Sequence, residues 1–438
     1  MAFAIDGLVS GLQTTSMIDS LMKIDAIPQT LLKAKVSASQ SLISAFQGLN
    51  SKVADLATLA GKTATTGALD LFTATSSSTN ATATAGTGAS AGSISLVVDQ
   101  LAQGQVSVSD PVTAWDSTTL TINGTTITAA SNSLDDVVSA INGSDTGVKA
   151  LKVSAGTDGS GNPQYRLQFS TSATGASSAF TIGGTAVAFT EITTAQDAQV
   201  TLWSGTAAAQ SVTSATNTFA ELLPGVSVTA AVASTTPITI TVAQDDAKIG
   251  TTASGLVDAV NGVLAYISTK TAVTNSTDAS GAAKVSGGVF TGDSTVRDVE
   301  SRILTAASAP VNGRSPSEFG FTITRDGTME FDSAKFASAL SADPAATMAA
   351  VQEIAARVEA AADQASDKYD GLLTSKITGQ QSLVKDMGDQ IIDWDQRLSI
   401  RRSSLERTYA ALEVALSRMN SQSSWLTGQL ASLPTNES

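Results

Sequence analysis

The amino-acid sequence predicts an α+β multidomain protein, with terminal helices that form a helical, coiled-coil leg domain and two β-rich head domains inserted between them. Residues 1–66 and 247–438 carry the apolar spacing of helices. Residues 67–246 are instead rich in Ser, Thr, Ala and Gly and contain short β-like runs. The last long helix also repeats an apolar residue at every seventh position, which is typical of a coiled coil.

The amino-terminal segment carries two apolar stripes. The first precedes Pro28, which either ends its helix or begins the next one because proline is tolerated only in the first turn. The second stripe alternates steps of four and three residues, which indicates a coiled-coil seam, although Gly48 weakens this helix by about 1 kcal/mol relative to alanine. The amino-terminal seam consists of Leu42, Phe46, Leu49, Val53 and Leu56.

The middle of the chain contains one clear supersecondary unit. Asn123-Gly124 between two short β-like runs is a strong hairpin signal, and a two-residue loop places Leu120 opposite Ile127. Ser133 follows with the spacing of an N-cap and predicts a short helix.

The region after the head returns to helical spacing and adds one small hairpin. Gly327 ends a three-residue loop that pairs Phe321 with Phe331, the common bulged form of hairpin. Asp332 and Asp343 have the positions of N-caps for two further helices.

The carboxyl-terminal helix has the most regular pattern in the chain. Its seven-residue repeat corresponds to about 75 Å of helix at 1.5 Å per residue. The second position of the repeat changes at Arg401-Arg402, which suits a helix whose partner changes along its length. A single internal core stripe is the alternative, but the matching amino-terminal seam favours a coiled coil of the two termini. The carboxyl-terminal seam consists of Ile377, Val384, Ile391, Leu398, Leu405, Leu412, Met419 and Leu426.

These patterns divide the chain into expected domains. Residues 1–66 form the amino-terminal coiled-coil helices. Residues 247–438 complete the leg domain with the small hairpin and the carboxyl-terminal coiled coil. The inner head domain is discontinuous and combines residues 67–112 with residues 197–246, and the outer head domain spans residues 113–196.

The composition excludes most catalytic and metal-binding chemistry. The 438 residues include no cysteine and no histidine, which removes disulfides, thiolate and His-ligated metals, and Ser-His-Asp catalysis. A net charge of −14 argues against nucleic-acid binding. No apolar run is long enough for membrane insertion, and the first twenty residues lack the features of a secretory signal peptide. We expect no enzymatic activity, no catalytic residue, no cofactor and no metal.

Three weak signals for chemistry have simpler interpretations. Residues 158–162 faintly resemble a calcium loop but lack its full ligand pattern, so a Gly-rich turn is favoured. The paired acids Asp135-Asp136 fit helix capping better than glycoside hydrolysis. Ser375-Lys376 lies on the heptad helix without the surroundings of a catalytic pocket.

Several segments, in the same order along the chain, resemble the flagellar hook-associated protein 2 family of filament capping proteins. The opening IDGLVSGLQTTSMIDSLM is the first of these segments. Residues 120–169 are similar to a repeat shared by flagellins and caps. The remaining similar segments are residues 198–228, residues 290–297, residues 319–331 and the terminal helix. Residues 271–286 are of low complexity and match nothing in the family's pattern.

The resemblance implies a secreted, homo-oligomeric cap at the distal tip of the bacterial flagellar filament, exported through the flagellar type III channel. Its implied partners are copies of itself, flagellin, the filament and hook-junction proteins, and an export chaperone on the carboxyl-terminal helix. Its implied role is to help exported flagellin fold and insert and to prevent its loss, and adhesion is a possible second role. The alternatives are another flagellar axial protein, flagellin-like or from the hook–filament junction, and a secreted β-rich adhesin or carbohydrate-active enzyme.

Overall fold

The computed structural model describes residues 13–277 and 280–431, and the chain divides into two compact units. Unit 1 combines residues 1–66 with residues 252–438, and unit 2 is residues 67–251. The two ends of the sequence therefore fold together around an inserted head, which is the predicted fold class. Residues 5–12 of the opening motif lie outside the described residues.

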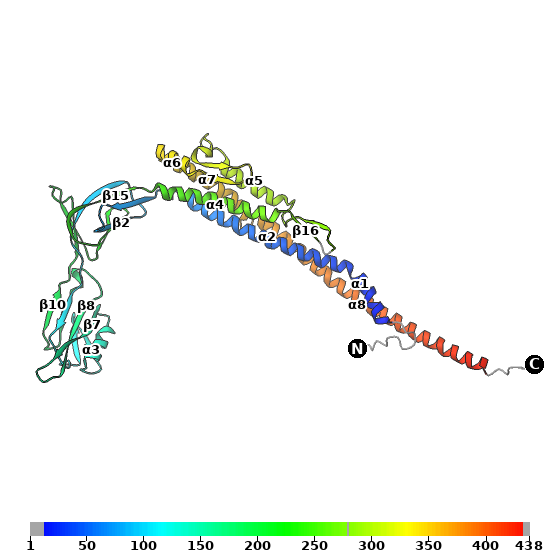
Figure 1. The fold of residues 1–438 in the computed structure, drawn as a ribbon, viewed down its shortest axis with the longest axis horizontal. Helices are drawn as coiled ribbons and strands as arrows, with labels where there is room; N and C mark the ends of the chain where they lie inside the picture. The colour runs from blue at the N-terminus through cyan, green and yellow to red at the C-terminus, as the bar shows by residue number, and fades with distance from the viewer. Residues whose placement is uncertain (1–12, 278–279, 432–438) are drawn as a thin grey trace, which may run out of the picture. The chain divides into compact units, whose positions relative to one another are not determined.

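Unit 1 is a bundle of long helices with two small hairpins (Figure 1). Its helices are α1 (Thr14–Asp25), α2 (Ile27–Ala64), α4 (Asp246–Thr271), α5 (Ser294–Ser308), α6 (Ser333–Ala342), α7 (Pro344–Ser366) and α8 (Leu372–Ala431). Its strands are β16 (Thr274–Thr277), β17 (Ala283–Ser286), β18 (Phe321–Ile323) and β19 (Met329–Phe331), and the 3₁₀ turn η2 (Pro316–Phe319) precedes β18. The first turn of α4 belongs to unit 2.

Local sequence sets the starts of several of these helices, as predicted. The Asp332 carboxylate accepts hydrogen bonds from two backbone N–H groups at the start of α6, and Asp343 accepts one at the start of α7. Pro344 occupies the first turn of α7, where no hydrogen bond is lost. The β18–β19 hairpin pairs Phe321 with Phe331, and their ring centroids are 5.4 Å apart.

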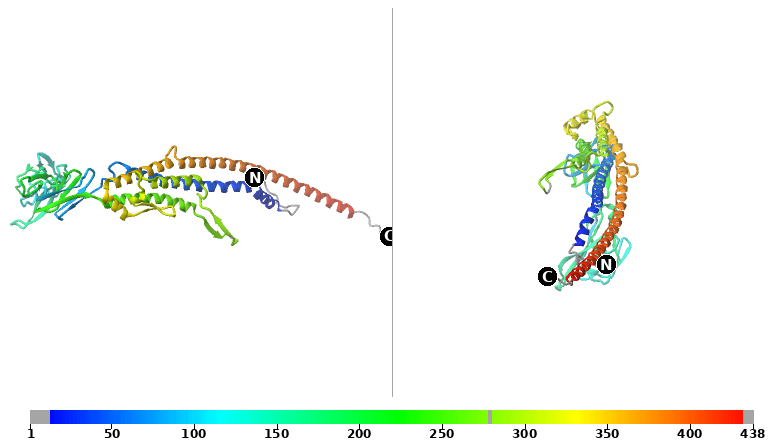
Figure 2. Two further views of the ribbon diagram at one scale, coloured as in Figure 1. Left: turned by 90° about the horizontal axis from the view of Figure 1, so that it is seen from above. Right: turned by 90° about the vertical axis from the view of Figure 1, so that its right-hand side faces the viewer.

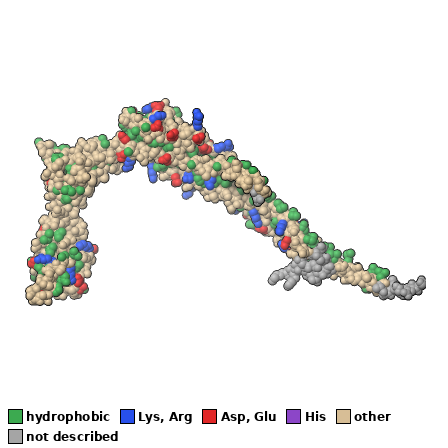
Figure 3. Space-filling model, viewed as in Figure 1, with side chains coloured by type: hydrophobic (Ala, Val, Ile, Leu, Met, Phe, Trp, Pro, Cys, Tyr) green, Lys and Arg blue, Asp and Glu red, His purple; other side chains and the backbone are tan. Residues whose placement is uncertain are grey.

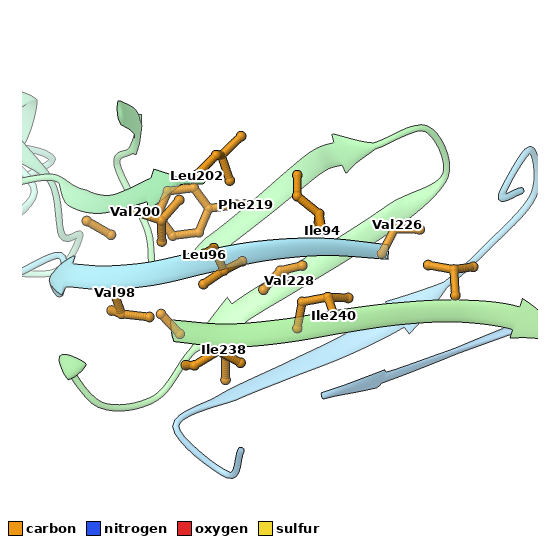
Figure 4. Close-up of a cluster of buried hydrophobic side chains, with 14 of the residues drawn as sticks. Ile94, Leu96, Val98, Val200, Leu202, Phe219, Val226, Val228, Ile238 and Ile240 are labelled. Atoms are coloured by element: carbon orange, nitrogen blue, oxygen red, sulfur yellow. The ribbon is translucent and has the colours of Figure 1, made fainter. Parts of the chain in front are cut away.

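The inner part of unit 2 consists of two antiparallel sheets. Their strands are β1 (Phe72–Ser76), β2 (Ala81–Ala85), β3 (Gly92–Gln100), β11 (Ala198–Leu202), β12 (Gln210–Ser214), β13 (Thr218–Leu223), β14 (Val226–Ala230) and β15 (Ser234–Gln244). One sheet has the order β1-β15-β3-β11-β12 and the other β13-β14-β2. Alternate side chains such as Leu96, Val228 and Ile240 point into a shared core (Figure 4).

The outer part of unit 2 has its own core around Trp115 and Phe169. Its elements are β4 (Val106–Ser109), β5 (Thr119–Ile122), β6 (Thr125–Thr128), α3 (Leu134–Asn142), β7 (Val148–Thr157), β8 (Pro163–Thr171), η1 (Ala176–Ser178), β9 (Ile182–Gly183) and β10 (Phe189–Thr193). The sheets have the orders β10-β4-β8-β7 and β6-β5-β9. Leu120 pairs with Ile127 as predicted, and Ser133 caps α3 by accepting a hydrogen bond from the Asp136 backbone N–H.

The boundary predicted at residue 112 is too late. Strand β4 lies before it but pairs with β8 and β10, so it belongs to the outer sheet and not to the inner head. Short Ser- and Val-containing strands look alike in the inner and outer parts, and only the pairing partner assigns β4 to one of them.

Candidate assembly surface

The two terminal helical segments run antiparallel in unit 1 (Figure 2). Three polar contacts define the direction: Gln29 Nε2 donates to Asp395 Oδ1, Arg401 pairs with Asp25, and Arg402 pairs with Asp19. The two ion pairs have N–O distances of 3.2 and 2.9 Å. Residue numbers rise along α8 as they fall along α2 and α1, so the carboxyl-terminal helix continues past the described start of α1.

The ion pairs explain why the heptad seam changes at Arg401-Arg402. Hydrogen bonds to Glu406, and to Asp19 on α1, raise the pKa of the Arg402 guanidinium above its usual value. Both arginines are exposed, so water screens the two ion pairs and they add little to stability. The ion pairs instead fix the register of α8 against α1. The apolar positions of α8 follow a different spacing on either side of these two arginines.

Most of the amino-terminal seam is buried inside unit 1. Phe46, Leu49 and Val53 are fully buried and Leu42 is half-buried, while Leu56 is also in the core. α2 packs against α8, as the predicted coiled coil of the two termini requires, and it also packs against α7, so this seam is part of a larger helical core. Small buried residues on α7 let α2 approach closely, and they are Ala350, Ala355, Ala362 and Ala365.

The carboxyl-terminal seam is only partly covered. Its residues from Ile377 to Leu405 are half-buried, and Leu412, Met419 and Leu426 are exposed, Leu426 at 55%. The fully covered apolar side chains of the described part of α8 are instead Leu373 and Met387. The seam thus faces its own unit near the start of α8 and loses that cover toward its end.

Further apolar side chains are exposed beside this seam, at positions outside its seven-residue repeat. On α8 they include Ile400, Val414, Trp425 and Leu430, and on α1 and α2 they include Met17, Leu21, Ile24, Ile27 and Leu31. Figure 3 shows hydrophobic side chains along the described end of α8. We call the exposed residues from Leu412 to Leu430 on α8 the distal apolar surface. Trp425 lies off the seven-residue repeat, so periodicity could not assign it.

The residues that gave weak signals for chemistry in the sequence have structural roles. The Asp158 carboxylate accepts hydrogen bonds from the backbone N–H groups of Asn162 and Ser160, and the Asn162 bonds lower its pKa. Asp135 forms an exposed ion pair with Lys152 at 3.0 Å. Among the described residues, no group of three or more acidic side chains is placed to hold a metal ion. None of the described helices is long and apolar enough to cross a membrane.

Family models match the chain in three places. Residues 195–421, more than half of the chain, match the flagellar hook-associated protein 2 carboxyl terminus, and residues 10–105 match its amino terminus. The chain belongs to the flagellar hook-associated protein 2 family. Residues 119–173, which include the β5–β6 hairpin and α3, match the flagellin hook IN motif.

Individual members of the flagellar hook-associated protein 2 family match this chain over different lengths. The protein of Escherichia coli O157:H7 is 26% identical over 466 residues, which cover 97% of each chain. The B-type protein of Pseudomonas aeruginosa is 27% identical over 227 residues, so the match spans about half of that relative, 47%. The crystal structure of domains D1 to D3 of the Escherichia coli flagellar cap protein has the same fold, with a TM-score of 0.54, 21% identity, and coverage of 76% of this chain and 99% of that one.

Proposed function

We infer that this chain is a structural cap subunit at the distal tip of the bacterial flagellar filament, outside the cell, where it assists the folding and insertion of exported flagellin and prevents its loss. Membership of the flagellar hook-associated protein 2 family supports the cap role. The exposed distal apolar surface on α8 is the observation that carries the mechanism. An apolar helix face that none of the described residues covers favours packing against further helices.

In this proposal, unit 1 acts as a leg that docks into the filament, and unit 2 forms part of the plate over the growing end. The chain works by binding and not by catalysis. Copies of the chain, flagellin and the filament or hook-junction proteins are its proposed partners. The half-covered seam residues Leu398 and Leu405 lie where the leg changes from covered to exposed.

A double substitution tests the leg. Leu398→Asp with Leu405→Asp places two charges on the apolar face, and burying them against a partner is strongly unfavourable. We expect the folded, exported variant to give short or absent filaments and to release flagellin into the medium. The matched control is Ser403→Asp with Ser404→Asp, two exposed neighbours on α8, which should leave elongation intact. Normal filaments and retained flagellin in the leucine variant would contradict the leg mechanism.

An export chaperone is the proposed occupant of the distal apolar surface before secretion. Met419, Leu426 and Leu430 lie on one side of α8 at helical spacing, which suits a helix bound in an apolar groove. We expect Leu426→Ser with Leu430→Ser to lower the amount of chain exported while the purified protein keeps its helical content by circular dichroism. Unchanged export of the variant would argue against this occupant.

A further inference from the structure

The sequence contains four Asn-Gly pairs, a combination in which an asparagine can react with its own backbone. The backbone nitrogen of the glycine attacks the side-chain carbon Cγ of the asparagine, and glycine carries no Cβ to hinder that approach. The reaction requires a side-chain amide that is free to rotate and a glycine N–H that donates no hydrogen bond. The four pairs are Asn123-Gly124, Asn142-Gly143, Asn261-Gly262 and Asn312-Gly313. Isoleucine or valine precedes each asparagine, so the local sequences are closely matched.

Hydrogen bonds hold two of these pairs closed. Both amide atoms of Asn142 bond to the Ala150 backbone, and both amide atoms of Asn261 bond to the Met329 backbone. The glycine after Asn142 donates its N–H to a helix carbonyl at the end of α3, and the glycine after Asn261 lies within α4. Neither pair therefore brings a free nitrogen against Cγ without local unfolding.

The other two pairs form turns with the same backbone conformation. The φ angles are 52° and 79° in Asn123-Gly124, and 49° and 77° in Asn312-Gly313. A positive φ at both central residues is the type I′ turn of a two-residue hairpin. The asparagine and the glycine are exposed in both turns. Exposure and backbone conformation therefore do not distinguish the reactivity of the two asparagines.

The two turns differ in the hydrogen bonds that hold them. The Asn123 N–H donates to the Thr181 carbonyl at 3.0 Å, and the Asn123 Oδ1 accepts from the Thr181 N–H at 2.9 Å. That turn also closes the β5–β6 ladder of four residue pairs. By contrast, none of the described residues forms a hydrogen bond with the Asn312 side chain, and an isolated bridge between Val311 and Arg314 closes its turn. A single bridge opens at a lower free energy than a ladder, so the Asn312 amide is the freest of the four.

We propose that Asn312 is a site of self-modification, at which the folded chain deamidates to isoaspartate and aspartate. The Gly313 nitrogen gives up its proton and bonds to Asn312 Cγ, and the Cγ–Nδ2 bond breaks so that Nδ2 leaves as ammonia with that proton. Water then opens the cyclic succinimide at one of its two carbonyl carbons. Attack at Cγ gives aspartate, and attack at the main-chain carbonyl carbon gives isoaspartate, in which the chain continues through Cγ. The reaction needs no enzyme and no oxidant, and it does not depend on the proposed cap function.

The product changes the charge and the length of this turn. A carboxylate two residues before Arg314 competes for its guanidinium with Glu318, whose Oε2 lies 3.0 Å from Arg314 Nε. Isoaspartate also adds one carbon to the main chain, so the 2.9 Å hydrogen bonds between Val311 and Arg314 lose their geometry. The turn leads directly into η2, which packs against α6. Deamidation thus alters a surface turn of unit 1 and leaves its helical core in place.

Peptide mapping by mass spectrometry tests the proposal on the purified full chain, incubated folded in mildly alkaline buffer. The Asn312 peptide should show the mass change from amide to carboxyl at least about tenfold faster than the peptides of the other three pairs, because their amides must first be released. In urea, the four matched sequences should react at similar rates. Equal rates at Asn123 and Asn312 in the folded chain, or reaction at Asn312 only in urea, would overturn the proposal.

Two substitutions give an independent measurement through enzymatic methylation of isoaspartate, which counts this product over the whole chain. Asn312→Gln keeps an amide, but its longer side chain closes a larger ring far more slowly, so the folded variant should form several-fold less isoaspartate than the parent. Asn123→Gln, in the equivalent turn, is the matched control and should leave the amount unchanged. An unchanged amount in Asn312→Gln, with helical content retained by circular dichroism, would assign the isoaspartate to another residue and reject the proposal.

Discussion

The side-chain amide of Asn261 on α4 forms two hydrogen bonds with the backbone of Met329 on β19. Asn261 Nδ2 donates to the Met329 carbonyl, and the Met329 N–H donates to Asn261 Oδ1, both at 2.8 Å. An amide side chain thus replaces a neighbouring strand at the edge of the β18–β19 hairpin. Asn142 does the same for Ala150 on β7, with bonds of 2.9 and 2.8 Å. Side chains of the same chain therefore form hydrogen bonds with the edge strands β19 and β7.

We expect Asn261→Ala to lower the free energy of unfolding of unit 1 by about 2–4 kcal/mol, because two buried backbone groups lose their partners. Chemical denaturation followed by circular dichroism measures the change. The matched control is Glu330→Ala, the exposed neighbour of Met329, which should change stability by less than about 0.5 kcal/mol. Equal effects of the two substitutions would show that the amide contact is unimportant.

Gly48 is a packing site and not only a weak point of α2. A Cβ at this position would collide with the Tyr266 hydroxyl, which donates a hydrogen bond of 3.1 Å to the Ala45 carbonyl. We therefore expect Gly48→Ala to destabilise the protein by about 1–3 kcal/mol, although helix propensity alone predicts a gain of about 1 kcal/mol.

Two further variants separate these effects. Tyr266→Phe removes the hydroxyl and should recover part of the stability lost in Gly48→Ala. Gly388→Ala on α8 has no atom within 4 Å of the new Cβ and should stabilise the chain by about 0.5–1 kcal/mol. Thermal unfolding compares all the variants, and a stabilised Gly48→Ala protein would contradict the packing argument.

Replacing a leucine by alanine should change the stability of the protein differently in the amino-terminal and the carboxyl-terminal seam. Leu49 is fully buried, so Leu49→Ala should cost about 2–5 kcal/mol of stability. Leu426 is exposed, so Leu426→Ala should change the stability of the isolated chain by less than about 0.5 kcal/mol. Under the proposed function, Leu426→Ala should nevertheless weaken filament capping, which a flagellin leakage assay measures. A large loss of monomer stability in Leu426→Ala would mean that the distal apolar surface has cover in the single chain.

Asp367 should make the turn between α7 and α8 sensitive to acid. The backbone N–H groups of Asp370 and Tyr369 each donate a 2.7 Å hydrogen bond to its carboxylate and lower its pKa. Because the folded-state pKa lies below the unfolded value of about 3.9, the contribution to stability is present above about pH 4 and is lost as the pH falls through the folded pKa. Asp367→Asn keeps an acceptor but cannot titrate.

Denaturation midpoints from about pH 2 to pH 6 test this dependence. The parent should be more stable than Asp367→Asn above about pH 4, and this difference in stability should shrink as the pH falls. Asp326→Asn, in the exposed turn between β18 and β19, serves as the matched control. A difference that grows as the pH falls would have the wrong sign for this mechanism.

The sequence correctly predicted turns and helix starts, because these depend on neighbouring residues. The Asn123-Gly124 turn, with φ of 52° and 79°, set the register of Leu120 on Ile127, and the caps at Ser133, Asp332 and Asp343 set helix starts. These features depend on contacts within a few residues, where propensity and spacing are informative.

The sequence by itself determined the architecture, because apolar period and turn chemistry are local properties: helical ends, an inserted β-rich head and an unbroken heptad on α8. Only the tertiary structure decided which apolar stripe is core and which is surface. Phe46 and Leu426 have the same spacing signal, but Phe46 packs against the ring of Phe290 in the core, and none of the described residues buries Leu426. The structure also shows that β4 pairs within the outer sheet and that Tyr266 packs against Gly48. Burial and strand pairing depend on residues distant in the chain, and periodicity cannot identify those partners.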